Sequence, residues 1–187
     1  MPEAVRAFLS VDIEDSALIS RITHIQQKLD RQAAKMKIVD PGNLHFTLRF
    51  FGDTRPGKID QIRNELEKIE FSSFTINIEG VGAFPSKRRP NVIWIGVTHN
   101  VERLTKLKLS IDDLLGNLGY PSDRRFHAHV TIARVRSVKD RERIFGNLDG
   151  LAAESVGTMS VDCFRLTRST LTQAGPIYET IWEVRGR

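Results

Sequence analysis

The sequence predicts an α+β fold made of two similar lobes, each a small β-sheet backed by helices. Expected strands and helices interleave without the regular alternation of a doubly wound parallel sheet. Two tetrapeptides with the same pattern, at residues 45–48 and 129–132, lie 84 positions apart (129 − 45 = 84) and suggest that the lobes resemble each other. The chain contains neither a glycine-rich phosphate loop nor a dinucleotide-binding fingerprint.

Runs of apolar or alternating residues predict seven strands. The expected strands span residues 4–11, 44–51, 74–81, 91–98, 126–133, 159–166 and 177–184. Residues 40–43 (Asp-Pro-Gly-Asn) predict a turn before the second strand. A loop with three consecutive basic residues separates the third strand from the fourth, and these residues are Lys87, Arg88 and Arg89.

Apolar residues at helical spacing predict four helices between these strands. The expected helices span residues 16–35, 56–69, 101–118 and 139–148. Asp15 or Ser16 is a favourable N-cap for the first helix, and Gly119 is a favourable residue to end the third.

The composition is that of a folded protein of one domain, residues 1–187, with 40% hydrophobic residues. A net charge of +5 is a mild basic excess that is compatible with an RNA partner. Cys163 is the only cysteine, so no internal disulfide can form. Neither a signal peptide nor a membrane-spanning stretch is recognisable, and we expect a monomer in the cytoplasm that does not contact membranes.

The two tetrapeptides carry the chemistry. Each reads His, apolar, Thr, apolar, and successive side chains of a strand point to opposite faces. His45 therefore shares a face with Thr47, and His129 shares a face with Thr131. Two such strands facing one another would place two imidazoles on opposite walls of a cleft.

Two imidazoles across a cleft suit the hydrolysis of a cyclic phosphodiester. One imidazole can deprotonate water while the other, as imidazolium, protonates the departing oxygen. Thr47 and Thr131 can donate hydrogen bonds to the nonbridging oxygens. No metal or other cofactor is required. Arg134 follows the second motif, and strict alternation would place it on the face opposite His129. We therefore expect a bulge or strand end near Ala133 that turns Arg134 toward the phosphate. The alternative is that Arg134 lies in solvent at the rim of the site.

Residues 44–53 and 126–134 resemble the paired signatures of the two-histidine (2H) phosphoesterase superfamily. The similarity is greatest to its RNA 2′,3′-cyclic phosphodiesterase branch, also known as 2′-5′ RNA ligase. Residues 6–13 resemble the first strand of that branch. The resemblance implies a bilobal fold with antiparallel sheets flanking a central groove. It also implies metal-independent conversion of 2′,3′-cyclic phosphate ends to 2′-phosphates, with ATP-independent 2′-5′ joining as the reverse reaction.

The family's functional positions fall on residues of this chain. The resemblance implies that His45 is the proton donor and His129 the proton acceptor. It assigns phosphate binding to Thr47, Thr131 and Arg134. This sequence departs from the family by having Ala128 where proline usually precedes the second histidine, which bears on the fine positioning of that strand.

Other interpretations remain open at this stage. The groove could bind nucleotides or RNA ends without turnover. His127 shares a face with His129, and such a pair could ligate a metal, although no nearby acidic residue or cysteine completes a site. Tyr178 and Arg49 are candidate substrate contacts, and Arg49 could instead pair with an acid. The other candidate contacts are His127, Lys87, Arg88 and Arg89. Substrates could be tRNA halves, other cleaved RNA or small cyclic nucleotides.

Overall fold

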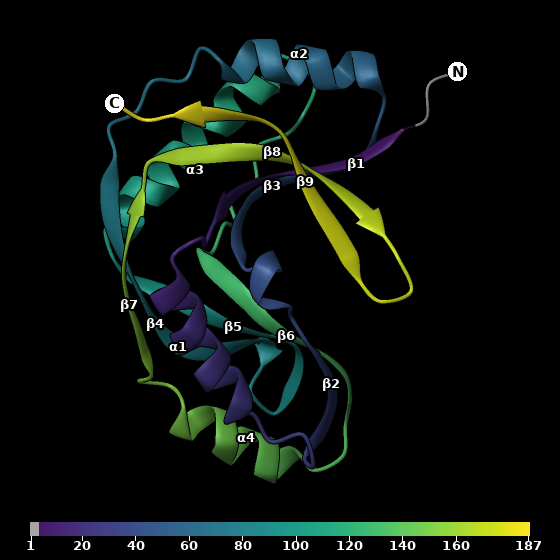
Figure 1. Cartoon of the computed structure of the whole chain (residues 1–187), viewed down its shortest axis with the longest axis vertical. Helices are drawn as coiled ribbons and strands as arrows, with labels where there is room; N and C mark the ends of the chain where they lie inside the picture. Colours follow the sequence, from purple (N-terminus) through teal and green to yellow (C-terminus); the bar gives the residue numbers. More distant parts are fainter. Residues whose placement is uncertain (1–3) are drawn as a thin grey trace.

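The computed structural model describes residues 4–187, in which nine strands form one curled sheet (Figure 1). The strands are β1 (Val5–Asp12), β2 (Ala34–Ile38), β3 (His45–Thr54), β4 (Phe74–Ser86), β5 (Arg89–His99), β6 (His129–Val138), β7 (Ser155–Val161), β8 (Cys163–Leu171) and β9 (Pro176–Arg185). The helices are α1 (Ser16–Gln27), α2 (Pro56–Leu66), α3 (Val101–Gly116) and α4 (Arg141–Gly150), with a short 3-10 helix η1 (Pro41–Asn43).

The sheet divides into a half of four strands and a half of five, because β2 pairs with β6 beside the main order of strands. Its order is β7-β4-β5-β6-β3-β1-β8-β9, and all the strand pairs are antiparallel. Strands β6 and β3 join the halves through one paired position, Phe46 opposite Val130. The two strands at the centre of the sheet, β6 and β3, therefore each carry one of the histidine motifs.

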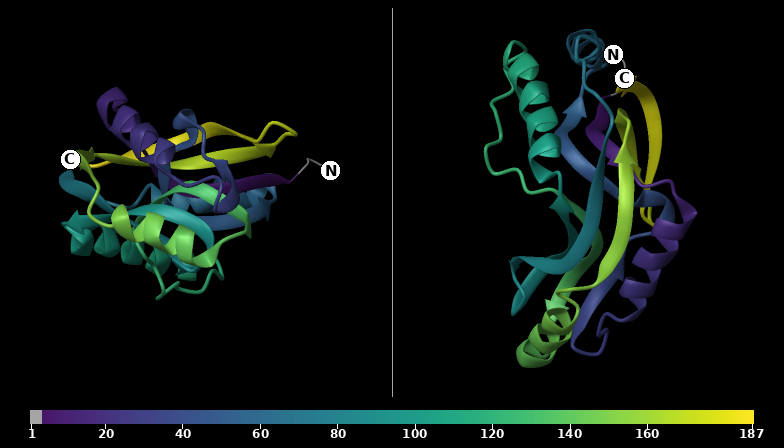
Figure 2. Two further views of the ribbon diagram at one scale, coloured as in Figure 1. Left: turned by 90° about the horizontal axis from the view of Figure 1, so that it is seen from below. Right: turned by 90° about the vertical axis from the view of Figure 1, so that its left-hand side faces the viewer.

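The helices are distributed between the halves (Figures 1 and 2). Helices α2 and α3 pack together at the end that holds β1, β8 and β9, whereas α1 lies on β6 and β7 and α4 lies on β4. Their inward faces are apolar, for example Ile22 and Ile25 on α1, and join the sheet residues in one continuous core. The predicted α+β class with two sheet-and-helix lobes is confirmed.

The first helix is shorter than the sequence predicts. It ends at Gln27 rather than near residue 35, and residues 34–38 form the unpredicted strand β2. The Asp30 carboxylate accepts hydrogen bonds from the backbone N–H groups of Gln32 and Ala33. Asn147 accepts another from the Asp30 backbone N–H. These side-chain bonds stabilise a turn where the apolar spacing alone predicts a helix.

Two further expectations about strands are wrong. The single strand predicted over residues 159–166 is two strands that separate at Asp162, because β7 pairs with β4 in one half and β8 pairs with β1 in the other. The predicted loop that holds Lys87, Arg88 and Arg89 is mostly strand, since β4 and β5 continue to a tight hairpin turn at Lys87 and Arg88.

An opening in the sheet lies where β3 and β2 separate along one edge of β6. Strand β3 pairs with β6 only at Val130, whereas β2 pairs with β6 from Ala133 onward. Residues 39–44, which include η1, connect the two strands. Backbone groups of β2, β3 and β6 thus surround a gap beside both histidine motifs.

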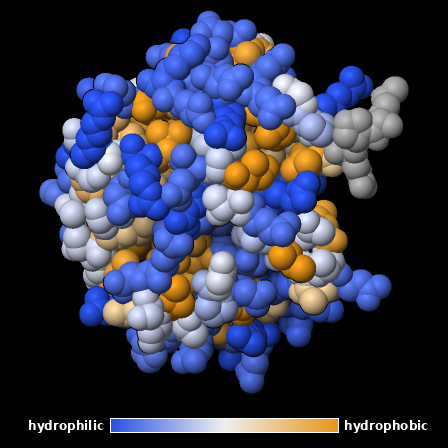
Figure 3. Space-filling view, turned by 45° about the horizontal axis from the view of Figure 1, so that its top comes forward, coloured by the Kyte–Doolittle hydropathy of each residue, from blue (hydrophilic) through white to orange (hydrophobic). Residues whose placement is uncertain are grey.

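On the face seen in Figure 3 the surface is predominantly polar, and apolar side chains appear as separate patches. Within residues 4–187, no helix combines the length and apolar character needed to cross a membrane.

Candidate active site

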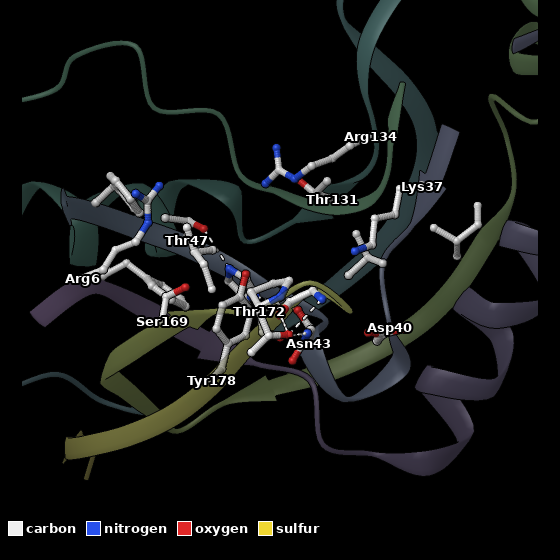
Figure 4. Close-up of a pocket in the computed structure, with 18 residues that line it drawn as sticks. Arg6, Lys37, Asp40, Asn43, Thr47, Thr131, Arg134, Ser169, Thr172 and Tyr178 are labelled. Atoms are coloured by element: carbon white, nitrogen blue, oxygen red, sulfur yellow. Dashed lines mark hydrogen bonds between the residues drawn. The ribbon is translucent and has the colours of Figure 1, made fainter. Parts of the chain in front are cut away.

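A cavity of about 650 Å³ fills the opening between β2, β3 and β6 (Figure 4). His45, Thr47, Thr131 and Arg134 line it, together with residues of the β8–β9 hairpin. His129 does not line this cavity directly. It lies two residues before Thr131 on β6.

The two motif strands are neighbours rather than opposite walls of a cleft, which corrects the expected geometry. Antiparallel pairing at Phe46 and Val130 places His45 beside Thr131, and Thr47 beside His129. The two histidines and two threonines therefore occupy the corners of one small area of the sheet. Phe46 and Val130 point to the opposite, buried face.

Both imidazoles are held in the same orientation. Nδ1 of His45 lies 2.8 Å from the carbonyl oxygen of Asn43, and Nδ1 of His129 lies 2.6 Å from that of His127. A carbonyl oxygen only accepts hydrogen bonds, so each Nδ1 carries the proton and each Nε2 is the atom that can exchange one. Nε2 of His45 lies 3.0 Å from the Thr47 hydroxyl, so both groups can contact one phosphate oxygen.

The environment of His45 disfavours its charged form. Burial lowers the pKa of the His45 imidazole, while its hydrogen bond to the Asn43 carbonyl and the charge of Asp12 raise it. The charges of Arg134 and His129 lower this pKa further. The influence of His129 follows from the closeness of the two rings.

Burial also lowers the pKa of His129. The hydrogen bond to the His127 carbonyl opposes this effect, and the charges of the His127 ring and Arg134 add to it. Both imidazoles therefore release a proton more readily than in water, which suits groups that must exchange protons with a substrate.

Aromatic rings support both histidines. Phe8 and Tyr178 lie 4.9 and 5.3 Å from the His45 ring, measured between ring centroids. Phe84 lies 5.1 Å from the His129 ring and meets it edge-on. Each imidazole thus has a fixed plane as well as a fixed tautomer. Tyr178, a candidate contact from the sequence, lines the cavity.

Arg134 reaches the cavity through a bulge. The pairing of β5 with β6 shifts between Ile93 opposite Ala133 and Trp94 opposite Thr131, so Ile132 has no paired residue on β5. This bulge returns Arg134 to the face of Thr131, and both side chains line the cavity. The expected bulge near Ala133 is present, although the strand continues to Val138.

Arg49 does not line the cavity. In the pairing of β3 with β1, Leu48 is skipped, and this bulge turns Arg49 to the other face of the sheet. There its guanidinium lies 3.2 Å from the Asp112 carboxylate and 2.7 Å from the Pro121 carbonyl oxygen. Of the two alternatives for Arg49, the structure shows pairing with an acid.

The basic hairpin also lies outside the cavity lining. Lys87 forms an ion pair with Asp149, and Arg88 with Glu142, so both are engaged by α4. Arg89 is exposed. These contacts match the interpretation of an ordinary charged surface more closely than that of a substrate contact.

His127 packs against aromatic rings outside this cavity. Its ring centroid lies 4.7 Å from that of Trp94 and 5.9 Å from that of His129. Within the described residues, no group of three or more His, Cys, Asp or Glu side chains is arranged to hold a metal ion. The suggested metal pair therefore has no third protein ligand beside it.

Several lining residues were not predicted from the sequence. Arg6 and Lys37 supply two more cations, at opposite ends of the cavity lining in Figure 4. Lys37 donates a 2.8 Å hydrogen bond to the Ala174 carbonyl in the β8–β9 turn. Phe50 contributes a ring that is 52% exposed. The cavity thus holds three cations around the threonine hydroxyls.

The two imidazoles, the two hydroxyls and Arg134 thus lie on two neighbouring strands, and comparison with known proteins shows the family to which the chain belongs. A family model described as LigT like Phosphoesterase matches the chain twice, over residues 11–94 and 95–178. The chain belongs to this family, and the resemblance to two-histidine phosphoesterases is confirmed. The two matches are offset by 84 residues (95 − 11 = 84), as the histidine motifs are.

Relatives extend over nearly the whole chain. An RNA 2′,3′-cyclic phosphodiesterase of Methanothermobacter thermautotrophicus is 39% identical over 176 residues, covering 93% of this chain and 95% of the relative. That of Archaeoglobus fulgidus is 38% identical over 177 residues, covering 95% and 98%. The crystal structure of Escherichia coli LigT in apo form has a TM-score of 0.79 at 22% identity and covers 99% of both chains, which shows a shared fold.

Proposed function

We propose that this protein is a metal-independent RNA 2′,3′-cyclic phosphodiesterase that produces 2′-phosphate ends. The observation that carries the proposal is the pair of imidazoles on neighbouring strands, each with Nδ1 bound to a carbonyl and Nε2 free to exchange a proton. The relatives named RNA 2′,3′-cyclic phosphodiesterase support the choice of substrate.

In the proposed reaction His129 acts as the base and His45 as the acid. Nε2 of His129 takes a proton from water, and the water oxygen bonds to phosphorus. The bond from phosphorus to the 3′ oxygen breaks, and Nε2 of His45 protonates that oxygen. The product carries a 3′ hydroxyl and a 2′-phosphate. Thr47, Thr131 and Arg134 bind the nonbridging oxygens, on which negative charge is concentrated.

The surroundings of the two rings differ in one respect that favours this division of roles. Burial lowers the pKa of both imidazoles, but at His45 the charge of the Asp12 carboxylate opposes this effect and favours the charged form that an acid needs. The charges that act on His129, from His127 and Arg134, both favour its neutral form, which a base needs. With the 5′ hydroxyl of a second RNA in place of water as the nucleophile, the same two proton transfers would join it to a 2′,3′-cyclic end through a 2′-5′ linkage and release the 3′ hydroxyl, and we include 2′-5′ joining in the proposal.

We further propose that the enzyme acts as a monomer in the cytoplasm, on tRNA fragments or other cleaved RNA. Both histidines come from one chain, so the site requires no residue from a second copy.

Cys163, the only cysteine, is half-buried, and burial raises its pKa to about 11, so it is mostly an unreactive thiol.

Product analysis tests the proposal. We expect the protein to convert an oligonucleotide with a 2′,3′-cyclic phosphate end to the 2′-phosphate in the presence of EDTA and without ATP. A phosphatase specific for 3′-phosphates distinguishes the two products. Loss of activity in EDTA would support the metal alternative, and tight binding without turnover would support the binding-module alternative. A 3′-phosphate product would contradict the assigned direction of attack.

A further inference from the structure

The two halves place different side chains at equivalent positions of the cavity. The bulge at Ile132 in β6 brings Arg134 into the cavity, and the bulge at Leu48 in β3 does the same for Phe50. Phe50 and Arg134 are 84 positions apart (134 − 50 = 84), the spacing that relates the two histidines. One half thus presents a phenyl ring where the other presents a guanidinium.

Arg6 supplies a guanidinium on the phenylalanine side. Its guanidinium carbon lies 5.0 Å from the centroid of the Phe50 ring, and both side chains line the cavity. Within residues 4–187, Arg6 forms no ion pair with a carboxylate. Arg6 and Arg134 both act electrostatically on Tyr178, which lies between them on the cavity wall. The cavity is therefore positively charged on both sides of the histidines.

Arg6 and Phe50 lie farther along β1 and β3 than the first histidine, since β1 pairs Asp12 with His45 but Phe8 with Phe50. Phe50 is three residues past Thr47, at most about 10 Å along the bulged strand at roughly 3.3 Å per residue. The cation at the other end of the cavity, Lys37, is already bound to the Ala174 carbonyl. The exposed ring of Phe50 beside a cation that forms no ion pair with any described residue is an arrangement that suits single-stranded nucleic acid, through stacking and phosphate contact.

We propose that Arg6 and Phe50 form a subsite for the second-last nucleotide of the RNA. The Arg6 guanidinium binds the phosphodiester that joins the last two nucleotides, and the Phe50 ring stacks on the second-last base. This inference rests on the proposed function and specifies its substrate as an RNA end of at least two nucleotides, in preference to a free cyclic nucleotide.

The test compares kcat/KM for two substrates. One is the linear dinucleotide ApU that ends in a 2′,3′-cyclic phosphate, and the other is uridine 2′,3′-cyclic phosphate. We expect the wild-type protein to prefer the dinucleotide. We expect the ratio of the two values to fall roughly ten- to a hundredfold in Arg6→Ala, the effect of losing one hydrogen-bonded charge contact. Phe50→Ala should lower the ratio as well, whereas Arg31→Ala, which removes an exposed charge in the turn after α1, should keep it.

A dinucleotide with a neutral methylphosphonate linkage is a second, independent probe. The wild-type protein should cleave the methylphosphonate dinucleotide with the kcat/KM that Arg6→Ala has for the natural dinucleotide. The Arg6→Ala variant should cleave both dinucleotides with the same kcat/KM. Arg6 and Phe50 are exposed, so these variants should fold, and thermal melting checks this.

Three outcomes would overturn the inference. A wild-type ratio near one would show that no second nucleotide is bound. An unchanged ratio in Arg6→Ala would remove Arg6 from any such subsite. Wild-type protein that cleaves neither substrate would overturn the proposed function itself, and that outcome is distinguishable because the other two require an active enzyme.

Discussion

Replacing either His45 or His129 with alanine is expected to lower kcat for hydrolysis of 2′,3′-cyclic phosphate ends by about 10²- to 10⁴-fold. In the proposed mechanism each ring supplies one of two proton transfers, and alanine removes that transfer. The loss in the double variant should be smaller than the product of the single losses, because the two transfers serve one transition state.

Glutamine at either position distinguishes the loss of proton transfer from the loss of side-chain packing. His45→Gln keeps a polar side chain against Phe8 and Tyr178 but cannot transfer a proton, so it should lose as much activity as His45→Ala. His24→Ala is the matched control, since His24 is exposed on α1 and does not line the cavity. Activity close to wild type in a folded His45 or His129 variant would contradict the acid-base assignment.

Asp112→Ala is expected to reduce the free energy of unfolding by about 3–5 kcal/mol. The Asp112 carboxylate is fully buried and forms an ion pair with Lys108, whose side chain is 1% exposed. It also accepts hydrogen bonds from Arg49 at 3.2 Å, the Ser122 hydroxyl at 3.3 Å and the Asp123 backbone N–H at 2.9 Å. Alanine would leave two cations with no acidic partner at this buried position.

Two matched variants test that explanation. Lys108→Met should cost less than Asp112→Ala, because the carboxylate would keep its other three donors. Asp113→Ala, at the next and exposed position of α3, should change stability by about 0.5 kcal/mol or less. Denaturant unfolding gives all three values. Equal losses in Asp112→Ala and Asp113→Ala would contradict a structural role for the buried carboxylate.

This cluster also bears on how the site is built. Asp112 holds Arg49 on the far face of β3, and it fixes Ser122 and Asp123 in the segment that leads to β6. Strand β6 carries His129, so the buried carboxylate connects the two motif strands from behind. We expect the Asp112→Ala variant to lose activity together with stability.

The motifs and the class of fold could be predicted from the sequence because both depend on local patterns. His45 and Thr47 share a face of β3 through simple alternation, and the repeat at 129 and 131 indicates two related halves. The chemistry of two imidazoles on a cyclic phosphate follows from these residue types.

The predictions that were wrong concern features that depend on contacts between residues distant in the sequence. Strict alternation places Arg49 beside His45, but the bulge at Leu48 forms through pairing with β1 and exchanges Arg49 for Phe50. Strand β2 exists because it pairs with β6, a partner about 100 residues away that its own short sequence does not reveal. The spacing of 84 residues was the available signal for Phe50, since Arg134 occupies the equivalent position.

An NMR titration of the histidine side chains tests most directly whether both imidazoles meet one phosphate. In the free protein the pKa values of His45 and His129 should lie below the ordinary value of about 6.5. Adding the product analogue 2′-AMP should raise both values, because its phosphate dianion would lie against both rings, while the exposed His24 and His99 serve as internal controls. A rise for only one of the two rings would contradict the account.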